Sequence, residues 1–222
     1  MRIAIGLYDR FTCLDAMGPF QVLSSLPGAQ VTFVAEKAGP VLDESGFLTV
    51  TAQASFADFP DPDILLVPGG IITGTLVPHH PIVAWIAKAH QTTTWTTSVC
   101  TGALLLAGAG VLEGVDATTH WSSLDELARL GARPVRERVV RRGKIITGAG
   151  VSAGIDMALT LAAAIEGPEF AQTLQLMMEY DPAPPFDTGS PEKAGPAAVQ
   201  RAFEAMVAVM QSLATPGHAR EA

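Results

Sequence analysis

A short run of consecutive apolar residues, Ile64 to Val67, is the feature that most constrains the fold. It lies between Asp63 and the turn-forming sequence Pro68-Gly69-Gly70. A strand that is apolar at every position is buried on both faces, which is typical of the interior of a parallel sheet with helices on both sides. Because β-type and helical runs also alternate along most of the chain, the sequence predicts an α/β fold with a doubly wound, mostly parallel sheet.

The remaining segments are assigned from their hydrophobic periodicity and from the Gly and Pro residues that bound them. We expect strands at 2–8, 29–35, 64–67 and 93–99, and hairpins at 40–50 and 135–147. Helices are expected at 15–26, 81–90, 101–109, 121–130, 151–165, 168–180 and 196–213, with a Pro- and Gly-rich loop at 181–195. No linker or repeat interrupts the pattern, so we expect a single domain over residues 1–222 with a flexible tail from about residue 214.

Composition limits the partners that the chain can have. Of the 222 residues 48% are hydrophobic and 16% are charged, and the mean hydropathy is +0.30. The two longest stretches without charge, 64–87 and 89–112, are interrupted by Pro, Gly and polar residues, so neither is a transmembrane helix. The N-terminal apolar run is too short for a signal peptide, which favours a cytoplasmic protein. A net charge of −8 opposes a nucleic-acid partner, and we expect no membrane association.

Basic residues are concentrated in one segment, 133–144, which contains five arginines and a lysine. We interpret this segment as a strand pair with a solvated outer face, and an anion or nucleic-acid site is the alternative.

Cys100 is the strongest candidate for a catalytic residue. It lies between a predicted strand and a predicted helix, with Ser98 two residues before it and Gly102 two residues after it. Small residues at these positions allow the sharp turn that exposes a nucleophile. The amides at the start of the following helix predict a lowered thiol pKa. A buried structural cysteine is the alternative, and we expect Cys13, which lacks this setting, to be a bystander.

Two more segments place candidate groups at the carboxyl ends of strands, where sites in such sheets lie. Gly70 would offer an oxyanion-type amide together with that of Thr101, although a simple turn would also need glycine. Asp15 is either a helix N-cap or a carboxylate that exchanges protons with the thiol.

These motifs resemble the DJ-1/PfpI superfamily and, within it, are most similar to the isonitrile (isocyanide) hydratases. The matching segments are Leu14–Pro19, Pro68–Gly70, Thr97–Gly102, Ala117–Trp121, Gly148–Asp156 and Leu176–Ser190. The resemblance implies a flavodoxin-like fold, a homodimer, Cys100 as nucleophile, Asp15 as its acidic partner and Thr101 as a catalytic neighbour. It implies addition of water to a small apolar isocyanide through a thioimidate, which gives an N-substituted formamide. The alternatives are a glyoxalase- or deglycase-like enzyme and a redox- or ligand-sensing domain.

Other residues are weaker candidates. His120 either caps the helix that follows it or pairs with Cys100, and we favour the capping role. No histidine has a second ligand at metal spacing, so we expect no metal and no cofactor. Trp121, Phe11 and Val151 are near the motifs in sequence and could line the pocket, although core packing explains each of them equally well.

Overall fold

The computed structural model describes residues 1–214. Within the chain, contacts define one compact unit over Met1–Tyr180 and a second that begins at Asp181. The single domain expected over residues 1–222 stays a prediction. The flexible tail predicted from about residue 214 lies almost entirely outside the described residues.

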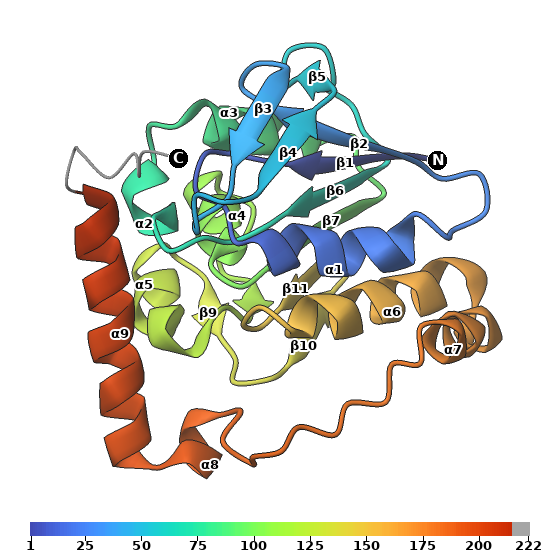
Figure 1. Ribbon diagram of the computed structural model, residues 1–222. Coiled ribbons are helices and arrows are strands. Elements are labelled where there is room, and N and C mark those ends of the chain that lie inside the picture. Colours follow the sequence, from blue (N-terminus) through green and yellow to red (C-terminus); the bar gives the residue numbers. More distant parts are fainter. Residues whose placement is uncertain (215–222) are drawn as a thin grey trace. The chain divides into compact units, whose positions relative to one another are not determined.

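A seven-stranded sheet forms the centre of the first unit, as far as residues 1–214 are described (Figure 1). All neighbouring strands are parallel except for the antiparallel pair at one edge. In spatial order the strands are β10 (Val139–Arg142), β11 (Ile145–Gly148), β7 (Trp95–Val99), β6 (Ile64–Val67), β1 (Arg2–Gly6), β2 (Gln30–Ala35) and β5 (Ala54–Ser55). The predicted doubly wound, mostly parallel sheet is therefore confirmed.

Helices cover both faces of this sheet (Figure 1). On one face α1 (Cys13–Leu23) packs against α6 (Ala153–Glu166), which also contacts α7 (Pro168–Met177). On the other face α3 (Pro81–Ala89) and α4 (Gly102–Gly108) pack together, and α2 (Thr73–Leu76) and α5 (Leu124–Arg129) lie against α4. With both faces covered, every residue of β6 is 0% exposed, as its unbroken apolar sequence predicts.

Shorter elements complete the molecule. A hairpin is formed by β3 (Gly39–Leu42) and β4 (Thr49–Ala52), and a small parallel pair by β8 (Asp116–Ala117) and β9 (Arg133–Pro134). A 3₁₀ turn, η1 (Trp121–Ser123), precedes α5. The second unit contains α8 (Pro191–Ala194) and α9 (Pro196–Ala214).

Three of the five arginines of the basic segment form ion pairs within the chain. Arg133 and Arg142 both bind Asp116, with shortest distances of 2.6 and 2.9 Å, and Arg138 binds Asp156 at 2.6 Å. These exposed ion pairs agree with a solvated outer face rather than with a site for an anionic partner.

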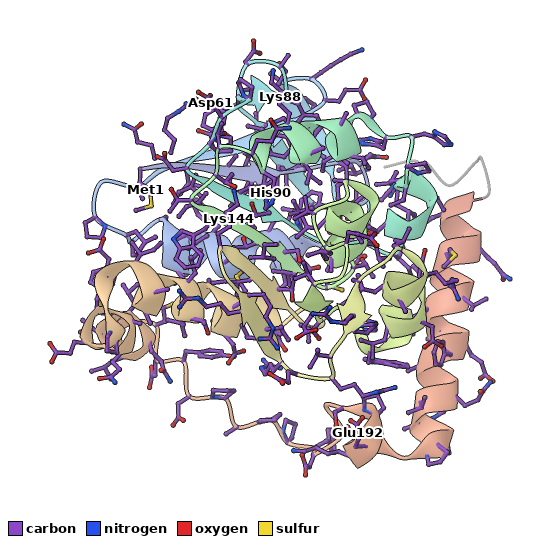
Figure 2. All side chains as sticks on the ribbon, turned by 180° about the vertical axis from the view of Figure 1, so that it is seen from behind. Met1, Asp61, Lys88, His90, Lys144 and Glu192 are labelled. Atoms are coloured by element: carbon purple, nitrogen blue, oxygen red, sulfur yellow. The ribbon has the colours of Figure 1, made fainter. Side chains whose placement is uncertain are left out.

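Lys144 connects segments at the amino-terminal ends of the strands, and it lies beside His90 in Figure 2. Its Nζ donates to the carbonyl oxygens of His90 and Thr93 at 2.5 and 3.0 Å. The His90 ring in turn bonds the Thr96 hydroxyl at 2.8 Å, so both side chains have a structural role at the end of the sheet opposite the candidate site.

None of the helices within residues 1–214 is both long enough and apolar enough to cross a bilayer.

Candidate functional site

The candidate site lies where three adjacent strands end. β7, β6 and β1 are neighbours in the sheet, and they lead into the segments that carry Cys100, Gly69 and Asp15 respectively. From β1 the chain proceeds first to β2 on one side and later to β6 on the other, so the strand order reverses here. In sheets of this kind such a switch point leaves a crevice at the carboxyl ends of the strands, where ligands bind.

Cys100 occupies the sharp turn that its sequence setting predicts. Its φ angle is +56°, a left-handed conformation that is strained for any residue other than glycine. The backbone N–H donates to the carbonyls of Gly148 and Ala149 at 3.1 and 2.8 Å, and the Thr119 hydroxyl donates to the Cys100 carbonyl at 2.9 Å. These bonds hold the strained turn in place. Gly102 is needed because a Cβ there would collide with the Val67 carbonyl.

Asp15 lies in the first turn of α1 but does not cap that helix. The N-cap residue is Thr12, and the Asp15 side chain instead accepts a hydrogen bond at Oδ2 from the Gly69 N–H at 2.9 Å. Asp15 is 0% exposed. Its Oδ1 has no hydrogen bond of normal geometry among residues 1–214, although the Cys100 thiol interacts with the carboxyl. Of the two roles left open by the sequence, the geometry agrees with a carboxylate that faces the thiol.

The environment of Asp15 favours its neutral form. Burial and, to a smaller extent, the charge of Glu44 raise the pKa of Asp15 from 3.8 to about 7, against the opposing effects of the Gly69 N–H and the Cys100 thiol. A carboxyl with a pKa near neutrality gains and loses a proton readily, which suits a general acid or base.

The prediction of a lowered thiol pKa at Cys100 is wrong. Burial raises the pKa of this thiol, and the negative charge of Asp15 raises it further. The N–H groups of Val151 and Thr101 and the Thr101 hydroxyl act in the opposite direction and lower the pKa of the thiol, but they do not outweigh burial. Burial at this position thus favours a protonated thiol beside the carboxyl group over a preformed thiolate.

The oxyanion-type role that we expected for the N–H of Gly70 stays a prediction. This N–H donates to Thr101 Oγ1 at 3.0 Å, so it is already used within the protein. Thr101 Oγ1 also lies 2.9 Å from the Gly70 carbonyl oxygen and 2.9 Å from Thr73 Oγ1. Gly69 has to be glycine here, because a Cβ would lie 2.6 Å from the Thr101 nitrogen.

The three pocket candidates differ in where they lie. Val151 is half-buried, has a φ of +27°, and directs its N–H at the Cys100 sulfur. Phe11 is 0% exposed within the core. Trp121 begins η1, and its ring packs against that of His120 with 5.3 Å between the centroids and 40° between the planes. Whether Phe11 and Trp121 line a substrate pocket stays a prediction.

His120 caps η1, as we favoured. Its Nδ1 lies 2.7 Å from Ser122 Oγ and accepts a weak bond from the Ser122 N–H at 3.4 Å.

Cys13 begins α1, and burial together with the charges of Asp43 and Glu44 raises the pKa of its thiol. No group of three His, Cys, Asp or Glu side chains within the described part of the chain could hold a metal ion.

Some contributors to the site carry no sequence signal. Tyr8 and Thr73 reach the Thr101 hydroxyl through hydrogen bonds, yet neither belongs to a motif. The N–H of Val151 faces the sulfur only because the segment after β11 lies beside the turn at Cys100.

Comparison with known proteins gives a consistent result. A model of the DJ-1/PfpI family matches residues 1–164. An isonitrile hydratase of Pseudomonas putida is 45% identical over 202 residues, which is 91% of this chain and 88% of the relative. A solved THiJ/PfpI family protein from Pseudomonas syringae has a TM-score of 0.85 and 39% identity, covering 93% of this chain and 86% of its own. The HTH-type transcriptional regulator CdhR of Pseudomonas aeruginosa is 31% identical over 60% of this chain but only 40% of its own.

Proposed function

The chain belongs to the DJ-1/PfpI family, and on this basis we propose that it is an isonitrile hydratase, which adds water to an organic isocyanide to give an N-substituted formamide. The 45% identity to a curated isonitrile hydratase, over most of both chains, supports this activity. The observation that carries the mechanism is the buried pair of Cys100 and Asp15 at the switch point of the sheet. We further propose that Cys100 is the nucleophile and that Asp15 transfers protons.

In the first step the sulfur and its proton are both added to one carbon atom. The terminal carbon of an isocyanide accepts a soft nucleophile, so Cys100 Sγ forms a bond to it while Asp15 takes the thiol proton. Asp15 then delivers that proton to the same carbon, which gives a thioimidate, R–N=CH–S–Cys100. The pKa of about 7 lets this carboxyl accept and release a proton at neutral pH.

In the second step water replaces the sulfur. Asp15 accepts a proton from the attacking water and passes it to the imidate nitrogen as the oxygen bonds to carbon, which gives R–NH–CH(OH)–S–Cys100. The carbon–sulfur bond breaks as the carbonyl forms, and the hydroxyl proton, which is the second proton of the water, goes to the sulfur. This releases R–NH–CHO and restores the thiol. One water is consumed and no oxidant or cofactor is required.

Hydrogen-bond donors around the sulfur stabilise the charge that develops there. The N–H groups of Thr101 and Val151 and the Thr101 hydroxyl act on the Cys100 sulfur from fixed positions. Preorganised donors of this kind lower the barrier when sulfur gains negative charge, both on attack and on departure. The strained φ angles at Cys100 and Val151 are consistent with backbone held in place for this purpose.

The test is formamide production from one alkyl and one aryl isocyanide. We expect Cys100→Ala and Cys100→Ser to abolish turnover with the fold retained, and Cys13→Ser, which alters the other cysteine, to keep it. During turnover the peptide that contains Cys100 should gain the mass of one isocyanide molecule. Formamide production by a folded Cys100→Ala protein would refute the nucleophile assignment. A homodimer and a small apolar isocyanide as substrate remain predictions from the family.

A further inference from the structure

Thr12 is the N-cap residue of α1, but its side chain does not cap that helix. A threonine at this position normally accepts a hydrogen bond from an N–H in the first turn of the helix. The Thr12 hydroxyl forms no such bond and lies 2.7 Å from Glu44 Oε2. A carboxylate only accepts hydrogen bonds, so the hydroxyl is the donor. The side chain therefore connects the start of α1 to the loop between β3 and β4.

The peptide group between Phe11 and Thr12 is held from both sides. Its carbonyl oxygen, that of Phe11, accepts a hydrogen bond from the Glu44 N–H at 3.0 Å, and its N–H, that of Thr12, donates to the Gly69 carbonyl at 2.8 Å. Glu44 thus binds this segment twice, once through its backbone and once through its carboxylate. Because a hydrogen bond to an ionised acceptor is short and strong, the carboxylate is a firm second anchor.

Gly69 connects this peptide to the carboxyl group of Asp15. Besides the bond from Thr12 to Gly69, the Gly69 N–H donates to Asp15 Oδ2 at 2.9 Å, and the Asp15 N–H donates to the Thr12 carbonyl at 3.1 Å. The three bonds form a ring that begins and ends at Thr12. Asp15 is 0% exposed, so bulk water cannot take the place of the Gly69 N–H if the ring opens.

We propose that Thr12 and Glu44 are positioning residues for Asp15: their hydrogen bond fixes the peptide that holds Gly69 and thereby keeps the Gly69 N–H on the Asp15 carboxyl. The role deepens the proposed hydratase mechanism and rests on it, because Asp15 is the group that carries protons there. Without the Thr12 hydroxyl the ring opens more readily, and ionised Asp15 loses its donor. Asp15 then holds its proton more tightly and accepts the thiol proton less readily.

Thr12→Val removes the hydroxyl with little change of shape. It loses no side-chain cap, and the extended backbone of Thr12, with φ −75° and ψ 118°, also suits valine. Thr12→Ser keeps the hydroxyl, and Glu44→Gln keeps an oxygen that can accept from Thr12 but removes the charge. Ser55→Ala is the matched control, because Ser55 in the edge strand β5 donates to a carboxylate oxygen of Asp58 at 2.6 Å.

The readout is an NMR titration of Asp15 between pH 5 and 9, in protein that carries carbon-13 at its aspartate carboxyl carbons. A pKa of about 7 separates Asp15 from ordinary aspartates, and its signal is absent from the Asp15→Asn protein. The titratable groups whose charges interact with that of Asp15 include Cys100, Glu44 and Tyr8. None of the three is altered in the Thr12 variants, so a change in those proteins reports on hydrogen bonding.

We expect Thr12→Val to raise the pKa of Asp15 by about one, a tenfold gain in proton affinity, as weakening a hydrogen bond to a charged group implies. Glu44→Gln should lower the pKa instead, because the charge of Glu44 raises it and the amide oxygen still accepts from Thr12. Thr12→Ser and Ser55→Ala should stay close to wild type. In turnover of an isocyanide, the rise of kcat/KM with pH should move to higher pH in Thr12→Val.

Two results would overturn the proposal. The first is an unchanged or lower pKa of Asp15 in Thr12→Val, or in Thr12→Ala if only that variant melts as the wild type does. The second is a Thr12→Ser titration that matches that of Thr12→Val, which would assign the effect to packing rather than to the hydroxyl. The titration needs no isocyanide, so absence of hydratase activity would refute the proposed function, while the role of Thr12 would still be decided by NMR.

Discussion

Replacing Asp15 by Asn should stabilise the protein at neutral pH while it removes activity. Asn has the same shape, and its carbonyl oxygen can accept the Gly69 N–H that now bonds Asp15 Oδ2 at 2.9 Å. Burial raises the pKa of Asp15 from 3.8 to about 7 in the folded protein. At about 1.4 kcal/mol for each pKa unit, ionised Asp15 costs the folded state about 4 kcal/mol.

The sign and the pH window follow from the direction of this shift. The folded protein binds the Asp15 proton more tightly than the unfolded chain does, because the pKa of Asp15 is higher in the folded state. The contribution of protonated Asp15 to the free energy of unfolding is therefore complete below about pH 4 and is lost as the pH rises to about 7. Above that pH it changes no further. The Asn variant lacks this titration, so the amount by which its free energy of unfolding exceeds that of the wild type should grow across the same pH range.

Thermal unfolding measured at pH 4.5, 6 and 8 checks this expectation. An advantage of about 4 kcal/mol at pH 8 corresponds to roughly 10 °C in melting temperature for a protein of this size. Asp43→Asn is the control: burial would raise the pKa of Asp43, but hydrogen bonds from Ser45, Leu48 and Gly46 lower it, so the stabilisation by ionised Asp43 is already complete above about pH 4. The difference in stability between this variant and the wild type should therefore stay constant from pH 4.5 to pH 8. A difference between Asp15→Asn and wild type that is the same at pH 4.5 and pH 8 would refute the raised pKa.

Three further predictions separate the roles of neighbouring residues. Asp15→Asn should lower kcat for isocyanide hydration at least a hundredfold, and an unchanged rate would remove Asp15 from the proton path. Gly69→Ala would place a Cβ 2.6 Å from the Thr101 nitrogen and 2.8 Å from Asp15 Oδ2, so we expect loss of activity together with a lower melting temperature. His120→Ala should cost about 1 kcal/mol of stability through the lost cap but retain activity within a few fold; a loss as large as that of Cys100→Ala would identify a Cys/His pair instead.

The sheet could be predicted because its signals are local and repeated. The apolar run of β6 and its Pro-Gly-Gly ending, for example, specify burial on both faces and the position of the turn. The elements that were missed, such as β9 and α2, have two and four residues. Segments this short have no periodicity that a sequence could reveal, and they form because longer elements bring their ends together.

Within the site, residue identity could be predicted but hydrogen-bond partners could not. Glycines after β6 were expected, yet the N–H of Gly69 is bound by Asp15, 54 residues away in the chain, and that of Gly70 by Thr101. Which glycine N–H donates to which side chain depends on how α1 and α4 approach the turn, and tertiary packing determines that approach. The same holds for Val151. Its N–H, in the segment after β11, acts on the sulfur of Cys100 at the end of the neighbouring strand β7.

The thiol pKa at Cys100 was predicted with the wrong sign because the sequence reveals the helix start but not the burial. This outcome bears on the sensing alternative, since cysteines that sense peroxide combine a low pKa with solvent access. Cys100 is 6% exposed, and both burial and Asp15 raise the pKa of its thiol. A protonated thiol beside a basic carboxylate is instead suited to a substrate that takes up sulfur and proton together. The terminal carbon of an isocyanide is such a substrate, because a single atom accepts both, and the raised pKa that disfavours sensing therefore agrees with hydration.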